Sequence, residues 1–251
     1  MLVDEMPIAT FESPPPASGA PCPPGARPQP AQQVRSQVFN VRLASSAGRH
    51  DAAGVLLRRM YAWRGYALDP AARQDGGRVT FYAETDGELV GTMSLALDLH
   101  GRLPADENFA DCLAPLRLAG RRLCEPSRLA IDKGMSKRVF AALIHISYLY
   151  AHRLRRFSDY VIEVNPRHVA FYQRMLGFSD FGGERDCSRV GAPAVLLRLP
   201  LDVMGEQIRR WGGSFDAAGA ERSFYPYFFP LREEAGITAR LAALCQGEDA
   251  A

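Results

Sequence analysis

Polar residues interrupt two apolar, strand-like segments in the middle of the chain, and their types could support proton transfer and anion binding. Glu125 and Arg128 break the segment LCEPSRLAI at 123–131, Asn165 closes the segment VIEV, and Tyr172 lies in the helical pattern that follows. A polar group that breaks an apolar strand costs free energy unless it has a partner or a function. These four residues are therefore the candidates for a functional site.

The spacing of Glu125 and Arg128 makes a prediction about the backbone. Glu125 could take a proton from an attacking amine, and Arg128 could hold a substrate carboxylate with a bidentate fork or orient Glu125. The alternative is that the two side chains only pair with each other. Residues three apart in a regular strand face opposite sides, so a shared cleft requires a bulge. Pro126 cannot donate a ladder hydrogen bond and predicts this bulge near its own position.

The elements that must position these residues can be recognised from hydrophobic periodicity. Strand and helix patterns alternate along the chain, and Asp86-Gly87 indicates a hairpin turn. The order predicts one mixed sheet with helices on both faces, an α/β (α+β) fold. Strands are expected at 37–43, 79–84, 88–99, 123–131 and 161–164 with a hairpin in 178–200, and helices at 49–63, 136–154, 167–176 and about 231–245, with shorter helices in 100–120 and after Pro200.

Three segments are expected along the chain. Residues 1–34 hold nine of the eighteen prolines, all within 1–33, and few large apolar residues, so we expect a disordered tail. Residues 35–200 form the predicted domain, and residues 201–251 a helical extension packed on it.

Composition limits the class of protein. The 251 residues are 47% hydrophobic and carry a net charge of +2, which fits a globular protein with no strong polyelectrolyte partner. No recognition motif indicates nucleic acid, and the five cysteines have no metal-ligand spacing, so no metal is expected. No apolar run reaches the roughly 18 residues of a membrane span, and no secretory signal opens the chain. We expect a cytoplasmic protein, with peripheral membrane association left open.

The order of elements resembles that of the GCN5-related N-acetyltransferase superfamily. Asn165 followed by AFYQRMLGF is similar to its motif B, a helix that bears a tyrosine before Gly-Phe. The superfamily's Arg/Gln-x-x-Gly-x-Gly/Ala loop, which holds the pyrophosphate of coenzyme A, should follow residues 123–131. That position reads DKGMSKR and lacks the glycine pair.

A narrower resemblance covers about residues 35–230. GRRLCEPSRLAID is similar to the Glu-x-x-Arg strand of acyl-homoserine lactone synthases, whereas LLRRMYAWRGY and SFYPYFFP resemble the long-chain N-acyl amino acid synthases. The resemblance implies an acyltransferase without a cofactor that moves a fatty acyl group from acyl carrier protein to an amino acid. The donor would carry phosphopantetheine, with coenzyme A as the alternative carrier. The alternatives are a lactone synthase and a catalytically inactive acyl-binding module.

The resemblance also implies roles for individual residues. Glu125 would be the base, and Tyr172 would protonate the leaving thiolate unless it is only a core aromatic. Asn165 would bind the pantetheine amide or cap the following helix. Met93, Leu95 and Phe140, with Leu97 and Ile144, would line an acyl slot unless they belong to an ordinary core.

Basic residues concentrate around the predicted site. Residues 117–156 contain eight arginines and two lysines against two carboxylates, a local net charge of +8. An acidic carrier protein would be attracted there; the alternative is that the charge belongs to a solvated helix face. The residues expected to bind the carrier are Lys137, Arg138, Arg153, Arg155 and Arg156.

Overall fold

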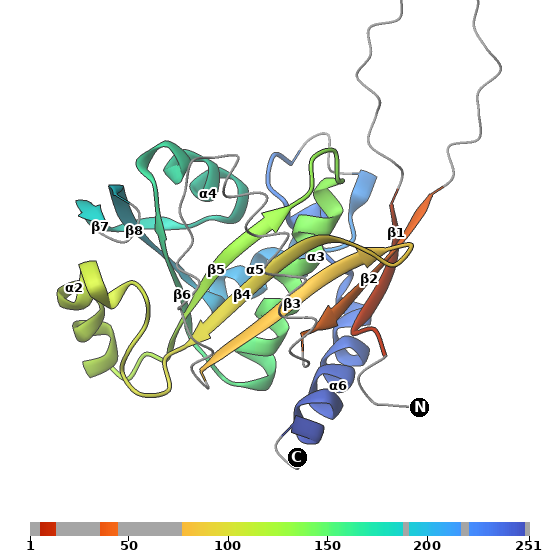
Figure 1. Cartoon of the computed structure of the whole chain (residues 1–251), viewed down its shortest axis with the longest axis horizontal. Coiled ribbons are helices and arrows are strands. Elements are labelled where there is room, and N and C mark those ends of the chain that lie inside the picture. Colours follow the sequence, from red (N-terminus) through yellow and green to blue (C-terminus); the bar gives the residue numbers. More distant parts are fainter. Residues whose placement is uncertain (1–5, 14–35, 45–76, 188–190, 217–220, 249–251) are drawn as a thin grey trace, which may run out of the picture.

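The computed structural model describes residues 6–13, 36–44, 77–187, 191–216 and 221–248. The predicted helix at 49–63 lies outside these residues. Eight strands form one sheet in the order β1-β2-β3-β4-β5-β6-β8-β7, in which β5 and β6 are parallel and the other neighbours antiparallel (Figure 1). The strands are Ala9–Ser13 (β1), Gln37–Leu43 (β2), Arg78–Thr85 (β3), Glu88–Leu97 (β4), Leu123–Ile131 (β5), Asp159–Val164 (β6), Ser179–Cys187 (β7) and Ala192–Pro200 (β8).

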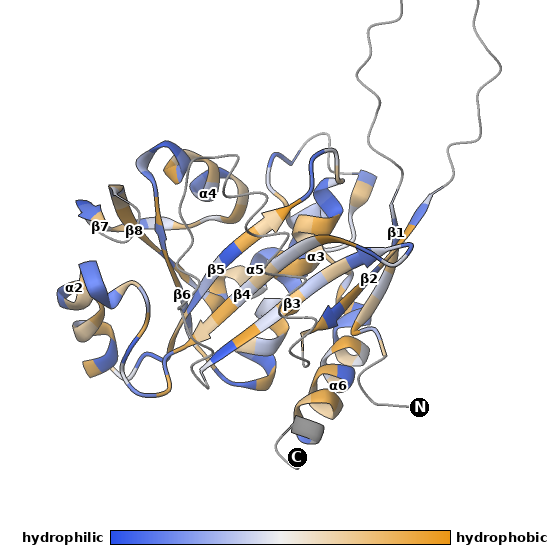
Figure 2. Ribbon diagram, viewed as in Figure 1, coloured by the Kyte–Doolittle hydropathy of each residue, from blue (hydrophilic) through white to orange (hydrophobic). Residues whose placement is uncertain are grey.

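Helices cover both faces of the sheet, which confirms the predicted fold class. The central helix α3 packs on one face, and ten consecutive residues from Val139 to Tyr148 are buried, as its apolar pattern predicts (Figure 2). On the opposite face, α2 packs through Phe109 and Leu113. The helical segments are Asp106–Leu118 (α2), Lys137–Tyr148 (α3), Leu149–Leu154 (η2), Pro166–His168 (η3), Val169–Leu176 (α4), Leu201–Trp211 (α5), Tyr225–Tyr227 (η5) and Leu231–Glu248 (α6).

The expectation that residues 1–34 are disordered throughout is wrong for residues 9–13. These residues form the edge strand β1, antiparallel to β2, with Ala9, Phe11 and Ser13 buried. Phe11 stacks on Phe39 with the ring centroids 5.4 Å apart. This alternation of buried residues covers only five positions, and proline-rich sequence follows it. The composition of residues 1–34 as a whole therefore did not indicate a strand.

The C-terminal segment completes the same core. Buried residues of α5, the SFYPYFFP tail and α6 belong to the cluster around α3. Two contacts hold the tail: Phe229 donates its N–H to His145 Nδ1 at 3.1 Å, and Tyr225 donates its hydroxyl to the Leu176 carbonyl at 2.6 Å. Burial lowers the pKa of His145, so its other nitrogen, Nε2, lies as a neutral donor 3.2 Å from Glu234.

Candidate active site

The parallel strands β5 and β6 are paired at one end and separate at the other. Their register contains two pairs, Leu123 with Asp159 and Cys124 with Tyr160, although both strands continue beyond them. In Figure 1 the two strands start together and diverge toward α4. Parallel strands that stop pairing leave a gap in the sheet, and the candidate site is built around this gap.

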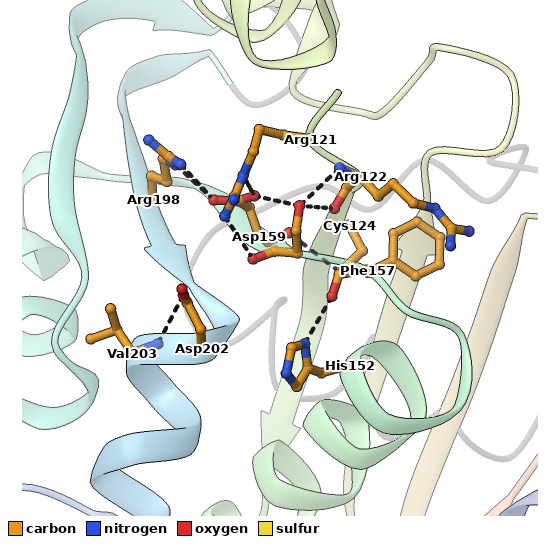
Figure 3. A network of polar contacts seen from close by, with 10 residues as sticks. Arg121, Arg122, Cys124, His152, Phe157, Asp159, Arg198, Asp202 and Val203 are labelled. Carbon is orange, nitrogen blue, oxygen red and sulfur yellow. Dashed lines mark hydrogen bonds and ion pairs between the residues drawn. The ribbon is translucent and has the colours of Figure 1, made fainter. Parts of the chain in front are cut away.

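A buried ion cluster holds the paired end of the two strands (Figure 3). Asp159 is fully buried and accepts hydrogen bonds from Arg121 at 2.6 Å, Arg198 at 2.9 Å and Ser158 at 2.6 Å. Burial by itself would raise the pKa of Asp159, but these hydrogen bonds outweigh it and hold the pKa below the ordinary value. Arg121 precedes β5 and Arg198 lies in β8, so the carboxylate joins the segments on both sides of β6.

A cavity of about 1450 Å³ extends through the gap and reaches both faces of the sheet. Phe140 and Ile144 of α3 line it on one face, whereas Leu103 and Ala194 line it on the other. Such a volume exceeds the usual range of about 300–1,000 Å³ for a small-molecule site, which suits two substrates that meet inside.

The structure brings Glu125 and Arg128 to this cavity through a bulge in β5. Thr92 of β4 pairs with Ala130, and Ser94 pairs with Ser127, so Arg128 and Leu129 stand opposite the single residue Met93. Arg128 has a φ of 51°, in the left-handed region that non-glycine residues rarely adopt. The predicted bulge therefore exists but lies two residues beyond Pro126, which still pairs in register with Leu95.

Glu125 meets the start of α2, a contact that the sequence did not predict. Its side chain is buried, and its Oε2 accepts the backbone N–H of Ala105 at 2.9 Å. Ala105 is the residue before α2, so the carboxylate lies at the positive end of the helix dipole. The helix is held in turn because Arg117 donates to Asp106 at 2.7 and 2.6 Å and to Asp98 at 2.6 Å.

Asn165 and Tyr172 line the cavity at the far end of β6. Asn165 Oδ1 accepts the N–H of Arg167 at 3.2 Å, and its Nδ2 donates to the Pro193 carbonyl at 3.2 Å. The expected helix cap is therefore present. The ring of Tyr172 packs edge-on against Phe171 and Phe178, with centroids 5.3 and 5.9 Å away, so the tyrosine belongs to the aromatic wall as well.

Four of the five residues expected to line an acyl slot border the cavity. Met93, Leu97, Phe140 and Ile144 line the cavity. Leu95 does not line the cavity and is fully buried in the main core. Residues that the sequence did not indicate complete the apolar wall: Leu129, Ile131, Phe171, Leu176, Phe178, Leu199 and Met204.

The structure does not bring the residues expected to bind the carrier together, because they lie at opposite ends of one helix. Lys137 opens α3, whereas Arg153 lies in the final turn of η2. Sixteen positions at about 1.5 Å each separate Lys137 from Arg153 by about 24 Å. Arg155 is at the same end of the helix as Arg153, and its guanidinium contacts Tyr150. Arg156 is the next residue in the chain. Arg138 packs on the rings of Phe11 and Phe215 and donates to the Glu12 carbonyl.

The fold and the divergent β5–β6 pair are those of a GCN5-related N-acetyltransferase, and the protein is an N-acyltransferase. The chain belongs to the N-acyl amino acid synthase FeeM family, whose model matches residues 52–200. The structure of FeeM, an N-acyl amino acid synthase from uncultured soil microbes, matches with a TM-score of 0.62 and 28% identity, over 66% of this chain and 93% of that one.

Two further solved structures are more distant. The acyl-homoserine lactone synthase LasI has a TM-score of 0.46 and 16% identity, over 66% of this chain and 91% of its own. An acyl-CoA N-acyltransferase from Pseudomonas aeruginosa has a TM-score of 0.44 and 15% identity, over 64% of this chain and 98% of its own. A search of curated protein sequences gave no match. In the described part of the chain, no helix is long and apolar enough to cross a membrane.

Proposed function

We propose that this acyltransferase moves a long-chain fatty acyl group from the thioester of acyl carrier protein to the amine of an amino acid. The observation that supports this most is the two-sided cavity in the gap between β5 and β6. Its α3 side is apolar and suits an acyl chain, with walls from Phe140, Ile144 and Met204, whereas its α2 side presents Glu125. The gap between them can hold the pantetheine arm, beside Asn165 at the open end.

The chemistry follows from these positions. Glu125 takes a proton from the amine, directly or through water, and the neutral nitrogen attacks the thioester carbonyl. The new C–N bond forms, the C–S bond breaks, and Tyr172 supplies a proton to the departing thiolate. The second proton of the attacking nitrogen returns to Tyr172 through water, and Glu125 releases its proton to solvent. Arg128 holds the acceptor's carboxylate or orients Glu125. This direct attack uses no covalent enzyme intermediate and no cofactor beyond the arm that the donor carries. Burial raises the pKa of Cys124 well above its usual value, so that thiol is a poor nucleophile.

Carrier docking is assigned to the open end of the gap rather than to the whole central helix. Lys137 is exposed in the first turn of α3, and its ammonium lies 5.8 Å from the centre of the Tyr227 ring in the C-terminal tail. Lys133, Arg167, Arg174 and Arg222 are exposed on the segments around the same end. A basic rim of this kind attracts an acidic carrier and places its pantetheine arm at the cavity.

Lys137→Glu tests the docking site, with Arg155→Glu as the matched control at the other end of the helix. We expect Lys137→Glu to raise the KM for acylated carrier protein and to reduce its dependence on salt, while Arg155→Glu leaves both unchanged. Equal effects of the two changes would contradict the assignment. If the enzyme prefers acyl-coenzyme A in the same assay, then coenzyme A and not the carrier protein is the acyl donor.

Mass spectrometry of lipid extracts tests the reaction itself. Bacteria that express the protein should accumulate a series of N-acyl amino acids that is absent with Glu125→Gln. The masses name both substrates. Lactones in place of this series, or no new lipid from a folded protein, would refute the proposal.

A further inference from the structure

Arg78 of β3 lies in the same row of the sheet as the candidate base. Arg78 pairs in register with Ala96 of β4, and Ala96 pairs with Glu125 of β5. Directly opposed residues of neighbouring strands point to the same face, so the three side chains share the face that α2 covers. All three line the cavity.

The guanidinium of Arg78 reaches over β4 to Ser127 of β5, with which it forms a hydrogen bond. Ser127 and Glu125 are two residues apart on the same face of β5, about 7 Å along the strand. Ala96, beside them on β4, contributes only a methyl group to the surface. An α-amino acid with a hydrogen bond of about 2.9 Å at each end fits such a span. Its amine would meet Glu125, and its carboxylate would meet the guanidinium.

A row of hydroxyl groups beside this one fixes the guanidinium in place. Arg78 Nη1 donates to Ser127 Oγ at 3.1 Å, and Ser127 pairs in register with Ser94. Ser94 Oγ in turn lies 2.8 Å from Thr80 Oγ1. Arg78 is thereby held over β5 next to Arg128, the residue that follows Ser127. A guanidinium beside Ser127 and a carboxylate at Glu125 match the two charges of an amino acid.

We propose that Arg78 binds the α-carboxylate of the acceptor amino acid and makes the enzyme selective for acceptors with a free carboxylate. This inference rests on the proposed function, since it assigns the acceptor half of that site. Arg78 is a binding residue in this proposal, and Ser127 positions it.

The test is a comparison of acceptors with the purified full-length protein and long-chain acylated carrier protein as the donor. The acceptors are the amino acid that the wild-type enzyme acylates fastest from a mixture of the twenty, and the α-amide of that amino acid. We expect the wild type to prefer the free acid. In Arg78→Gln, kcat/KM for the free acid should fall about 10- to 100-fold, while kcat/KM for the amide and the KM for the donor stay unchanged.

Further variants separate binding from a structural role. Arg78→Lys keeps the charge without the fork and should recover part of the preference, and Ser127→Ala should raise only the KM for the free acid. Arg209→Gln, an exposed arginine of α5, is the control for loss of a positive charge. Equal losses for acid and amide in Arg78→Gln, or no preference in the wild type, would overturn the role of Arg78 alone. A wild-type enzyme that acylates no amino acid would overturn the proposed function and this inference together.

Discussion

Replacement of Glu125 by glutamine tests the base with little disturbance of the fold. The carboxylate accepts the Ala105 N–H at 2.9 Å, and the amide oxygen of glutamine can accept the same hydrogen bond. The variant therefore loses the charge and the proton acceptor but keeps the contact with α2. General-base catalysis contributes about 10²- to 10⁴-fold, so kcat should fall by that factor. At about 1.36 kcal/mol for each factor of ten, the loss is about 2.7–5.4 kcal/mol of transition-state stabilisation.

The pH dependence distinguishes loss of the base from general damage. A free α-amine has a pKa of about 7.7–8.0, so below that range its neutral fraction rises nearly tenfold with each pH unit. The rate of Glu125→Gln should rise by the same factor, because the amine must lose its proton to solvent before it attacks. The wild-type rate should depend on pH less steeply, since Glu125 removes the proton at the site.

The assay is steady-state turnover of the purified enzyme between pH 6 and pH 8, with Glu163→Gln as the matched control. Glu163 lines the same cavity and accepts a hydrogen bond from Asn108 at 2.7 Å, which a glutamine oxygen can also accept. We expect this control to keep the wild-type rate and pH profile. A Glu125→Gln variant within about threefold of the wild type, or parallel pH profiles, would refute the role of Glu125 as base.

Three further predictions follow from the site. Tyr172→Phe should lower kcat at least about tenfold without a change in the KM for the donor, as measured by steady-state kinetics, because the ring still packs but the acid is lost; an unchanged kcat would leave Tyr172 as a wall residue. Arg128→Gly should keep the free energy of urea unfolding within about 1 kcal/mol of the wild type, because relief of the left-handed strain offsets the loss of contacts. Turnover of the same variant should fall at least about tenfold. A large loss of stability would show that Arg128 is structural. Asp159→Ala should lower that free energy by about 1–3 kcal/mol, because Arg121 and Arg198, which are partly exposed, lose the buried acceptor that they share. In the wild type this contribution is present above the ordinary aspartate pKa of 3.8 and is lost as the pH falls through the lower folded-state value, so a variant with the same acid unfolding profile as the wild type would contradict it.

Local patterns in the sequence were sufficient for the elements that carry the site. The strand at 123–131 has the predicted bounds, and Gly177 ends α4 in the left-handed conformation, as the pattern before it indicates. Asp86 and Gly87 both have positive φ in the β3–β4 turn, as an Asp-Gly hairpin requires. These features depend on a few neighbouring residues, so periodicity and turn chemistry predict them. Short segments likewise indicated the superfamily, through motif B, and the family, through LLRRMYAWRGY and SFYPYFFP.

Local sequence patterns did not predict which residues face each other on neighbouring strands, because this depends on strand register. The bulge could be expected from the spacing of Glu125 and Arg128, but its position at Arg128 and Leu129 depends on which residues of β4 face them. The same register places Arg78 in line with Glu125, although 47 positions separate them in the sequence. No local pattern marks Arg78 as part of the site.

Charge shows the same division between sequence and tertiary structure. The sequence correctly shows that residues 117–156 are strongly basic, but about 24 Å of helix separates Lys137 from Arg153, and Arg121 forms an ion pair with Asp159. The sequence by itself indicated most of the described elements, the family and the polar residues on β5, but not the edge strand β1. The tertiary structure decided which of those residues meet, because strand register, the divergence of β5 from β6 and the docking of α2 arise from packing between segments that are distant in the chain.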